Sequence, residues 1–230
     1  MSEEHWWVQH AVLMNEIHAS ADSFYTWKAI NERAANDPEV LLQIHRNPAF
    51  WNTVLYGLQT TFIITIGRIF DSNTKSNSIK NLLSEMVAHP EYFSKTALER
   101  RKLTQNKGGS PSWLPVYMRD AWEPSKADLE QISNAMQQTF DKYKRIYKPI
   151  RDKIFAHRDI GVDVQALLGV TLISEVEAIL YDVRDTLEAI SSIYMNGLKP
   201  RLGHRKYENE PLSTETMRLL TGLHATDDAP

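Results

Sequence analysis

The sequence has 230 residues, of which 42% are hydrophobic, so it is long enough to bury a sizeable core as one domain with or without a tail. Its formal net charge of -3 excludes a surface that is basic throughout, so any nucleic acid would have to bind a local patch. The chain contains no cysteine, which excludes disulfides, thiolate zinc ligands and a thiol nucleophile. This usage suits a reducing compartment, and we expect a cytoplasmic protein.

The N-terminal sequence MSEEHWWVQH has two acids and no basic segment ahead of an apolar run, which argues against a signal peptide. The stretch nearest to a membrane span is residues 51–70, but Asn52, Gln59 and Arg68 interrupt it. Its strongest apolar residues recur every fourth position, as in an amphipathic helix. We therefore expect a buried core helix there and no association with a membrane.

Hydrophobic periodicity along the rest of the chain is helical, with few glycines and prolines between the apolar segments. The N-terminal helix should stop at the sequence NDP, and Asn47 should cap the helix that begins at Pro48. The predicted helices cover residues 3–34, 39–45, 48–71, 78–88, 94–105, 126–160 and 171–195. The fold should therefore be all-α, a bundle of four to five helices.

Residues 106–124 contain two glycines, three prolines and two tryptophans, and we expect a long irregular insertion loop there. Ser125 and Asp128 have the spacing of a capping box, which starts the next helix. Pro149 lies inside that helix and should kink it just before Arg151. We expect one helical domain over residues 1–198, followed by a polar tail or appended helix over residues 199–230.

The sequence RDKIFAHRD, from Arg151 to Asp159, places an arginine six residues before His157 at the end of the kinked helix. Such a pairing is common by chance, and a second one joins Arg218 to His224. The second pairing lies in the weakly patterned tail, whereas the first lies at the end of a core helix among other charged residues. The context therefore favours the first pairing as a site.

This arrangement resembles the HEPN superfamily, whose helical bundles carry an Arg-(4 to 6 residues)-His signature on a late core helix. It resembles the abortive-infection branch most, for which RDKIFAHRD is a typical form of the motif. A second similar stretch is GRIFDSNTKSNSIKNLL, residues 67–83, which combines an Arg-x-x-Asp helix end with a polar loop and a short helix. The resemblance covers about residues 45–196.

The resemblance implies a HEPN-type endoribonuclease that cleaves single-stranded or structured RNA without a metal or other cofactor, in phage defence or as a toxin. It implies a homodimer with both motifs at one cleft, and an antitoxin or defence-system protein as a possible partner. A histidine near neutral pKa suits the removal of a ribose 2′-OH proton, and the planar guanidinium of arginine suits the phosphorane charge. The catalytic candidates are Arg151, Asp152 and His157, and the supporting or RNA-binding candidates are Arg68, Asp71, Lys153 and Arg158.

Other interpretations of the same residues remain open. Histidine and arginine in the last turn of a helix are favoured by the helix dipole alone, and Arg68 with Asp71 is more often a local pair than a site. A catalytically inactive HEPN module that binds RNA or a partner protein is the main alternative function. A plain helical scaffold dimer is the third.

Two basic segments stand next to aromatic residues, ERRKLTQNK at residues 99–107 and DKYKRIYK at residues 141–148. Lysine and arginine beside aromatic rings suit single-stranded RNA, which binds through charge and base stacking. Such segments are more often solvated helix faces. The sequence alone leaves both interpretations open.

Overall fold

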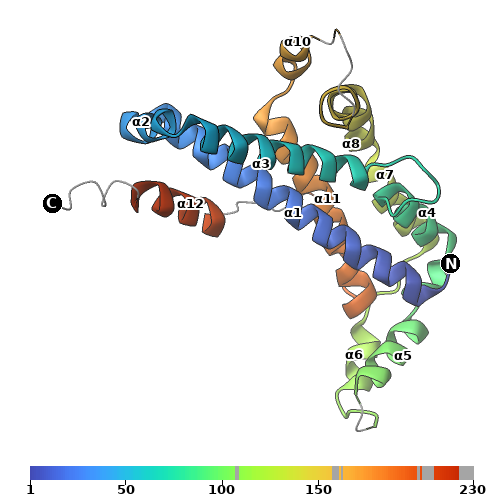
Figure 1. Ribbon diagram of the computed structural model, residues 1–230. Coiled ribbons are helices and arrows are strands. Elements are labelled where there is room, and N and C mark those ends of the chain that lie inside the picture. Colours follow the sequence, from blue (N-terminus) through green and yellow to red (C-terminus); the bar gives the residue numbers. More distant parts are fainter. Residues whose placement is uncertain (107–108, 157–160, 162, 201–202, 204–209, 223–230) are drawn as a thin grey trace.

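The computed structural model describes residues 1–106, 109–156, 161, 163–200, 203 and 210–222, and every regular element in these ranges is helical (Figure 1). The first half of the chain forms α1 (Glu3–Asn36), α2 (Pro38–Arg46), α3 (Pro48–Ile69), α4 (Ile79–Ala88), a 3-10 turn at Pro90–Phe93 and α5 (Lys95–Gln105). The second half forms α6 (Leu114–Asp120), α7 (Lys126–Ala135), α8 (Gln137–Lys142), α9 (Lys148–Ile150), α10 (Val164–Gly169), α11 (Ile173–Asn196) and α12 (Glu210–Gly222). The expected all-α fold is confirmed.

The core lies between the three long helices α1, α3 and α11, with α4 and α7 packed beside them (Figure 1). Residues spaced three or four apart on each helix face this core, as the periodicity predicted. Trp6 of α1 is fully buried and donates its indole N–H to the carbonyl oxygen of Leu82 on α4, at 3.1 Å. This hydrogen bond joins α1 to α4 and satisfies the polar N–H group of the buried indole.

Helix α3 is buried over only part of its length. Its second half contributes Phe62 and Ile66 to the core, whereas Phe50 and Tyr56 in its first half are 61% and 59% exposed. The expectation of a core helix throughout residues 51–70 therefore holds for the second half alone. No helix among the described residues is long and apolar enough to cross a membrane.

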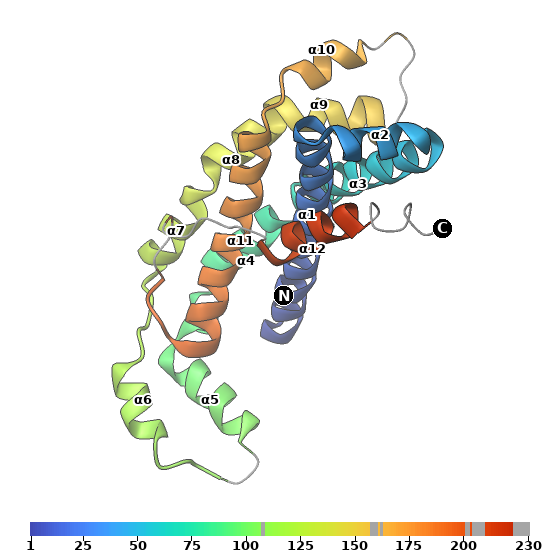
Figure 2. The same ribbon diagram turned by 90° about the vertical axis from the view of Figure 1, so that its left-hand side faces the viewer.

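The long helical path after the 106–124 connection begins at α7, where Ser125 and Asp128 form the predicted capping box. This path continues through α8 and α9 and includes two π-helical stretches, Tyr143–Tyr147 and Arg151–Ala156 (Figure 2). Pro149 lies between them and has no N–H to donate to the preceding turn. The N–H of Lys148 bonds to the carbonyl of Tyr143, five residues back. The expected break before Arg151 thus takes the form of widened turns.

The connection over residues 106–124 differs from the irregular loop expected, because α6 forms within it. Helices α5 and α6 lie together and project from one end of the bundle (Figures 1 and 2). Leu114 of α6 is buried, and the hydroxyl of Tyr117 donates to the carbonyl of Asn196 at 2.8 Å. A buried leucine and a bond to the end of α11 stabilise a short helix whose sequence is rich in loop-forming residues.

Helix α12 lies across α1, on the side seen in Figure 2. Its Leu220 is buried in a small second cluster with Ile30 of α1 and Val40 of α2. Thr216 of α12 is also buried. The segment after residue 199 therefore contributes one helix that packs on the bundle.

Candidate active site around Arg151

Arg151 begins the second π-helical stretch, and its side chain lies directly against the backbone of α3 at Gly67. A Cβ atom added at Gly67 would lie 2.4 Å from Cδ and 2.7 Å from Nε of Arg151. These distances are well inside van der Waals contact, so only glycine leaves room for the arginine stem. Gly67 thereby allows the Arg151 side chain to lie against α3, at the cleft described below.

Asp152 contacts two cations that precede it in the chain, Lys148 and Arg151. Its carboxylate forms an ion pair with Lys148, one turn earlier, and one of its oxygens lies 3.3 Å from Nη1 of Arg151. All three side chains are partly exposed, so the pairs are screened by water and contribute little to stability. Asp152 places a negative charge beside the Arg151 guanidinium.

Arg151 lines a cleft of about 560 Å³ that runs over the end of α3, α4 and the path from α7 to α9. Four cations and two carboxylates contribute to its lining, which gives the cleft an excess of positive charge in a chain whose net charge is negative. The cations are Lys80, Lys144, Lys148 and Arg151, and the carboxylates are Asp71 and Asp141. Such a lining favours an anionic ligand.

Tyr143 forms the apolar part of the cleft next to Arg151. Its ring stacks on Phe70 with centroids 4.6 Å apart. Burial raises the pKa of Tyr143 to about 12, although the positive charge of Arg151 acts in the opposite direction. The hydroxyl is therefore protonated at neutral pH and can donate a hydrogen bond, but it cannot act as a base there.

The two residues expected to support the site from the end of α3 are separated by the structure. Asp71 lines the cleft with Arg151, and one of its oxygens accepts from the N–H of Asn73 at 3.0 Å. Arg68 instead pairs with Glu16 of α1, with Nη2 and the carboxylate oxygen 2.6 Å apart. Arg68 is thus committed to the α1–α3 contact, and its ion pair is not with Asp71.

The structure describes only one of the three remaining candidates. Lys153 is exposed on the second π-helical stretch, whereas His157 and Arg158 lie outside the described residues. In the second Arg-His pairing, Arg218 is exposed on α12, whereas His224 lies outside the described residues. Helix α12 contributes nothing to the lining of the cleft.

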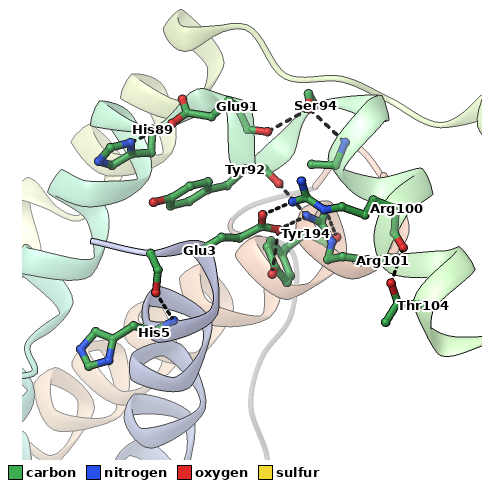
Figure 3. Close-up of polar contacts among 12 residues, drawn as sticks. Glu3, His5, His89, Glu91, Tyr92, Ser94, Arg100, Arg101, Thr104 and Tyr194 are labelled. Carbon is green, nitrogen blue, oxygen red and sulfur yellow. Dashed lines mark hydrogen bonds and ion pairs between the residues drawn. The ribbon is translucent and has the colours of Figure 1, made fainter.

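In the first basic segment, residues 99–107, two arginines bind residues of other helices (Figure 3). Arg101 is 13% exposed and forms an ion pair with Glu3, and it donates to the carbonyl oxygens of Tyr92 and Tyr194 at 2.9 and 2.7 Å. Its guanidinium carbon also lies 3.8 Å from the centre of the Tyr194 ring. Arg100 pairs with the same glutamate. These two arginines hold α5 to the ends of α1 and α11.

Several cleft residues were not singled out from the sequence. Lys144 and Lys148 lie one turn apart in the second basic segment and lead to Arg151 on the same side of the helical path, so their spacing carried a usable signal. Lys80 comes from α4, and Gly67 contacts Arg151 from another helix. No local pattern in the sequence reveals either of these contacts.

Potential metal ligands do not gather anywhere in the described part of the chain. No group of three histidine, aspartate or glutamate side chains there is close enough to hold a metal ion. The described residues that line the cleft beside Arg151 include two carboxylates, Asp71 and Asp141. The cleft is therefore best described by its cations.

The fold and this cleft define a class of protein: an all-α bundle with an arginine fixed on a late core helix, at a basic cleft. A family model described as AbiU2 (HEPN_AbiU2) matches residues 7–210. The chain therefore belongs to this HEPN-type family, which is associated with abortive infection. The match extends beyond the region of resemblance seen in the sequence and includes most of α1. No curated protein and no solved structure matches the chain.

Proposed function

We propose that the protein is a HEPN-type endoribonuclease that acts in phage defence or as a toxin, and that the Arg151 cleft is where it binds the scissile phosphate of RNA. The observation that carries the proposal is the close approach of Arg151 to Gly67, which leaves room for an arginine at the edge of a basic cleft. Membership of a family associated with abortive infection supports the biological setting.

The proposed reaction needs no group from outside the chain and the RNA. His157 takes the proton of a ribose 2′-OH, the 2′-oxygen bonds to phosphorus, and the bond from phosphorus to the 5′-oxygen breaks. The leaving 5′-oxygen takes a proton from solvent. Arg151 stabilises the charge that develops on the phosphorane oxygens, and Asp152 positions Arg151. The products are a 2′,3′-cyclic phosphate and a 5′-hydroxyl.

A homodimer with both motifs at one cleft is part of the proposal. Exposed apolar residues near the motif support it, since Tyr56 stacks on Phe155 of the motif segment with ring centroids 6.2 Å apart and is 59% exposed. Leu172 and Ile173, where α11 begins, are 58% and 45% exposed. An isologous interface that covers these exposed apolar residues would pair the two motifs.

The test compares three single substitutions in the full chain. Arg151→Ala and His157→Ala should each lower RNA cleavage and cellular toxicity by about 100-fold or more, because each removes a group that acts on the reacting phosphate or ribose. His224→Ala, in the second Arg-His pairing, is the matched control and should retain the parent activity. Melting temperatures of all three should stay close to that of the parent.

Two results would contradict the proposal. If His157→Ala unfolds the protein while activity per folded molecule is unchanged, the motif is a helix terminus and not an active site. If Arg151→Ala and His157→Ala both cleave RNA like the parent, the proposed site is wrong, and the alternative of a module that only binds RNA or a partner protein takes its place.

A further inference from the structure

The cleft extends beyond Arg151 along one side of a single helical path. Residues 134, 137, 141, 144, 148 and 151 all line it, and successive members of this series are three or four positions apart. That spacing places them on one face of a helix. Neutral amides occupy the start of the series and cations its end, so the two ends of the cleft differ in chemistry.

The cationic end has charge that the protein itself does not neutralise. Lys148 and Arg151 share Asp152, but Lys80 and Lys144 form no ion pair with any residue that the structure describes. Both lysines are exposed. Two uncommitted ammonium groups and a guanidinium that line the same cleft favour a phosphate group as ligand.

The other end presents groups that suit a base. Asn134 and Gln137 line the cleft with amides that both donate and accept, as the polar edge of a base does. Gln137 donates to Asp141 at 3.0 Å, which holds its side chain in place. Phe140 is partly buried and adds apolar surface between the amides and Lys144.

The dimensions of the cleft agree with this division. Gln137 and Lys144 are two helical turns apart, roughly 10 Å along the axis. That distance is comparable with the length of one nucleotide from its phosphate to the far edge of its base. The volume of about 560 Å³ also lies within the usual range for a small-ligand site.

We propose that this cleft binds one unpaired nucleotide, with its phosphate among Lys80, Lys144 and Arg151 and its base against Asn134 and Gln137. The proposal rests on the proposed function in one respect, that the phosphate at Arg151 is the one to be cleaved. A nucleotide within the RNA substrate and a free nucleotide have the same chemistry, and the experiment separates these two sources.

Binding to the full-length protein is measured with two kinds of probe. The first is a single-stranded RNA with 2′-O-methyl groups throughout, which lacks the attacking hydroxyl and stays intact. The second is the set of free AMP, GMP, CMP and UMP. Gln137→Leu and Lys144→Ala are compared with Gln138→Leu and Lys126→Ala, whose residues are exposed and do not line the cleft.

The proposal predicts that Lys144→Ala weakens binding about tenfold, because it removes a charged contact with phosphate. It predicts that Gln137→Leu changes the preference among bases, and that both control variants bind like the parent. Tight binding of RNA with weak binding of mononucleotides assigns the cleft to the substrate, and micromolar binding of one mononucleotide assigns it to a free nucleotide. Either result supports a nucleotide site.

Equal affinity of the parent, Gln137→Leu and Lys144→Ala for both probes would overturn the inference, as would a parent that binds neither probe. Failure of the proposed function would look different, because binding of the uncleavable RNA does not depend on catalysis. Loss of binding in Gln137→Leu together with normal cleavage by His157→Ala would refute the nuclease assignment alone.

Discussion

Arg101 and Arg151 both lie in charged helical segments of this protein, but their surroundings differ. Arg101 lies under the ends of α1 and α11, where its two terminal nitrogens bind Glu3 and two carbonyl oxygens. Arg151 lies on Gly67 at the edge of a cleft, and the ion pair that it forms among the described residues is a 3.3 Å contact with the partly exposed Asp152. The difference shows that the neighbouring helices, and not the local charge, decide whether an arginine stabilises the fold or is available to a ligand.

The largest effect on stability should come from Arg101. Arg101→Ala should lower the free energy of unfolding by about 2 kcal/mol, because the carbonyls of Tyr92 and Tyr194 would lose a charged donor, while Glu3 would keep its pair with Arg100. Arg100→Ala is the control and should cost less than about 1 kcal/mol, since Arg100 is 64% exposed. Urea unfolding measures both. Equal effects would mean that burial does not separate the two arginines.

The next effect concerns the contact beneath Arg151. Gly67→Ala should reduce RNA cleavage about tenfold or more, because its methyl group would displace the Arg151 side chain. Stability should change much less than activity, since alanine is favoured over glycine inside a helix by about 1 kcal/mol. The readouts are kcat and KM together with the melting temperature.

Gly57→Ala provides the control for that substitution on the same helix. No atom lies within 4 Å of a Cβ built at Gly57, so this variant should gain stability and keep full activity. If Gly67→Ala also keeps full activity, Arg151 does not need the position in which the structure places it.

The structure could be predicted from the sequence where the decisive forces are local. The capping box of Ser125 and Asp128, the end of α1 before Asp37 and the helical character of the whole chain follow from patterns within one or two turns. The widened turns around Pro149 follow in part, since the missing N–H predicts a break but not its π-helical form.

The rest depends on contacts between distant segments. The pairing of Arg68 with Glu16 and the approach of Arg151 to Gly67 each join two helices, and no periodicity specifies them. The formation of α6 likewise depends on the end of α11, to which Tyr117 donates a hydrogen bond. The sequence indicated a motif, whereas the cleft beside it required the packing of the bundle.

A smaller effect should distinguish Arg68 from Asp71, the first and last residues of the Arg-x-x-Asp sequence. Arg68→Ala should cost about 0.5 kcal/mol of stability and leave cleavage unchanged, because the partner of Arg68 is Glu16 on a partly exposed surface. Asp71→Ala should instead change RNA binding, since Asp71 lines the cleft. A loss of activity in Arg68→Ala with unchanged RNA binding in Asp71→Ala would reverse this assignment.

The smallest effect is a dependence of stability on pH that should come from His10 in the core. Burial lowers the pKa of His10 below its ordinary value of 6.5, and its Nε2 lies 2.9 Å from the carbonyl oxygen of Leu187. Below pH 6.5 the unfolded chain gains a proton that the folded chain resists, so stability should fall as the pH drops. Urea unfolding at pH 7.5 and pH 5.5 measures this, and His10→Gln should reduce the slope.

The central claim is that RNA is cleaved at Arg151 by attack of its own 2′-hydroxyl, and the chemistry of the product ends tests this most directly. Purified protein in excess EDTA is incubated with RNA, and the ends are identified by mass spectrometry. We expect 2′,3′-cyclic phosphate and 5′-hydroxyl ends. These ends should not form with Arg151→Ala, nor from an RNA that carries a single 2′-deoxy substitution at the cleavage site. Ends bearing 3′-hydroxyl and 5′-phosphate, or cleavage that requires added zinc or manganese, would contradict it.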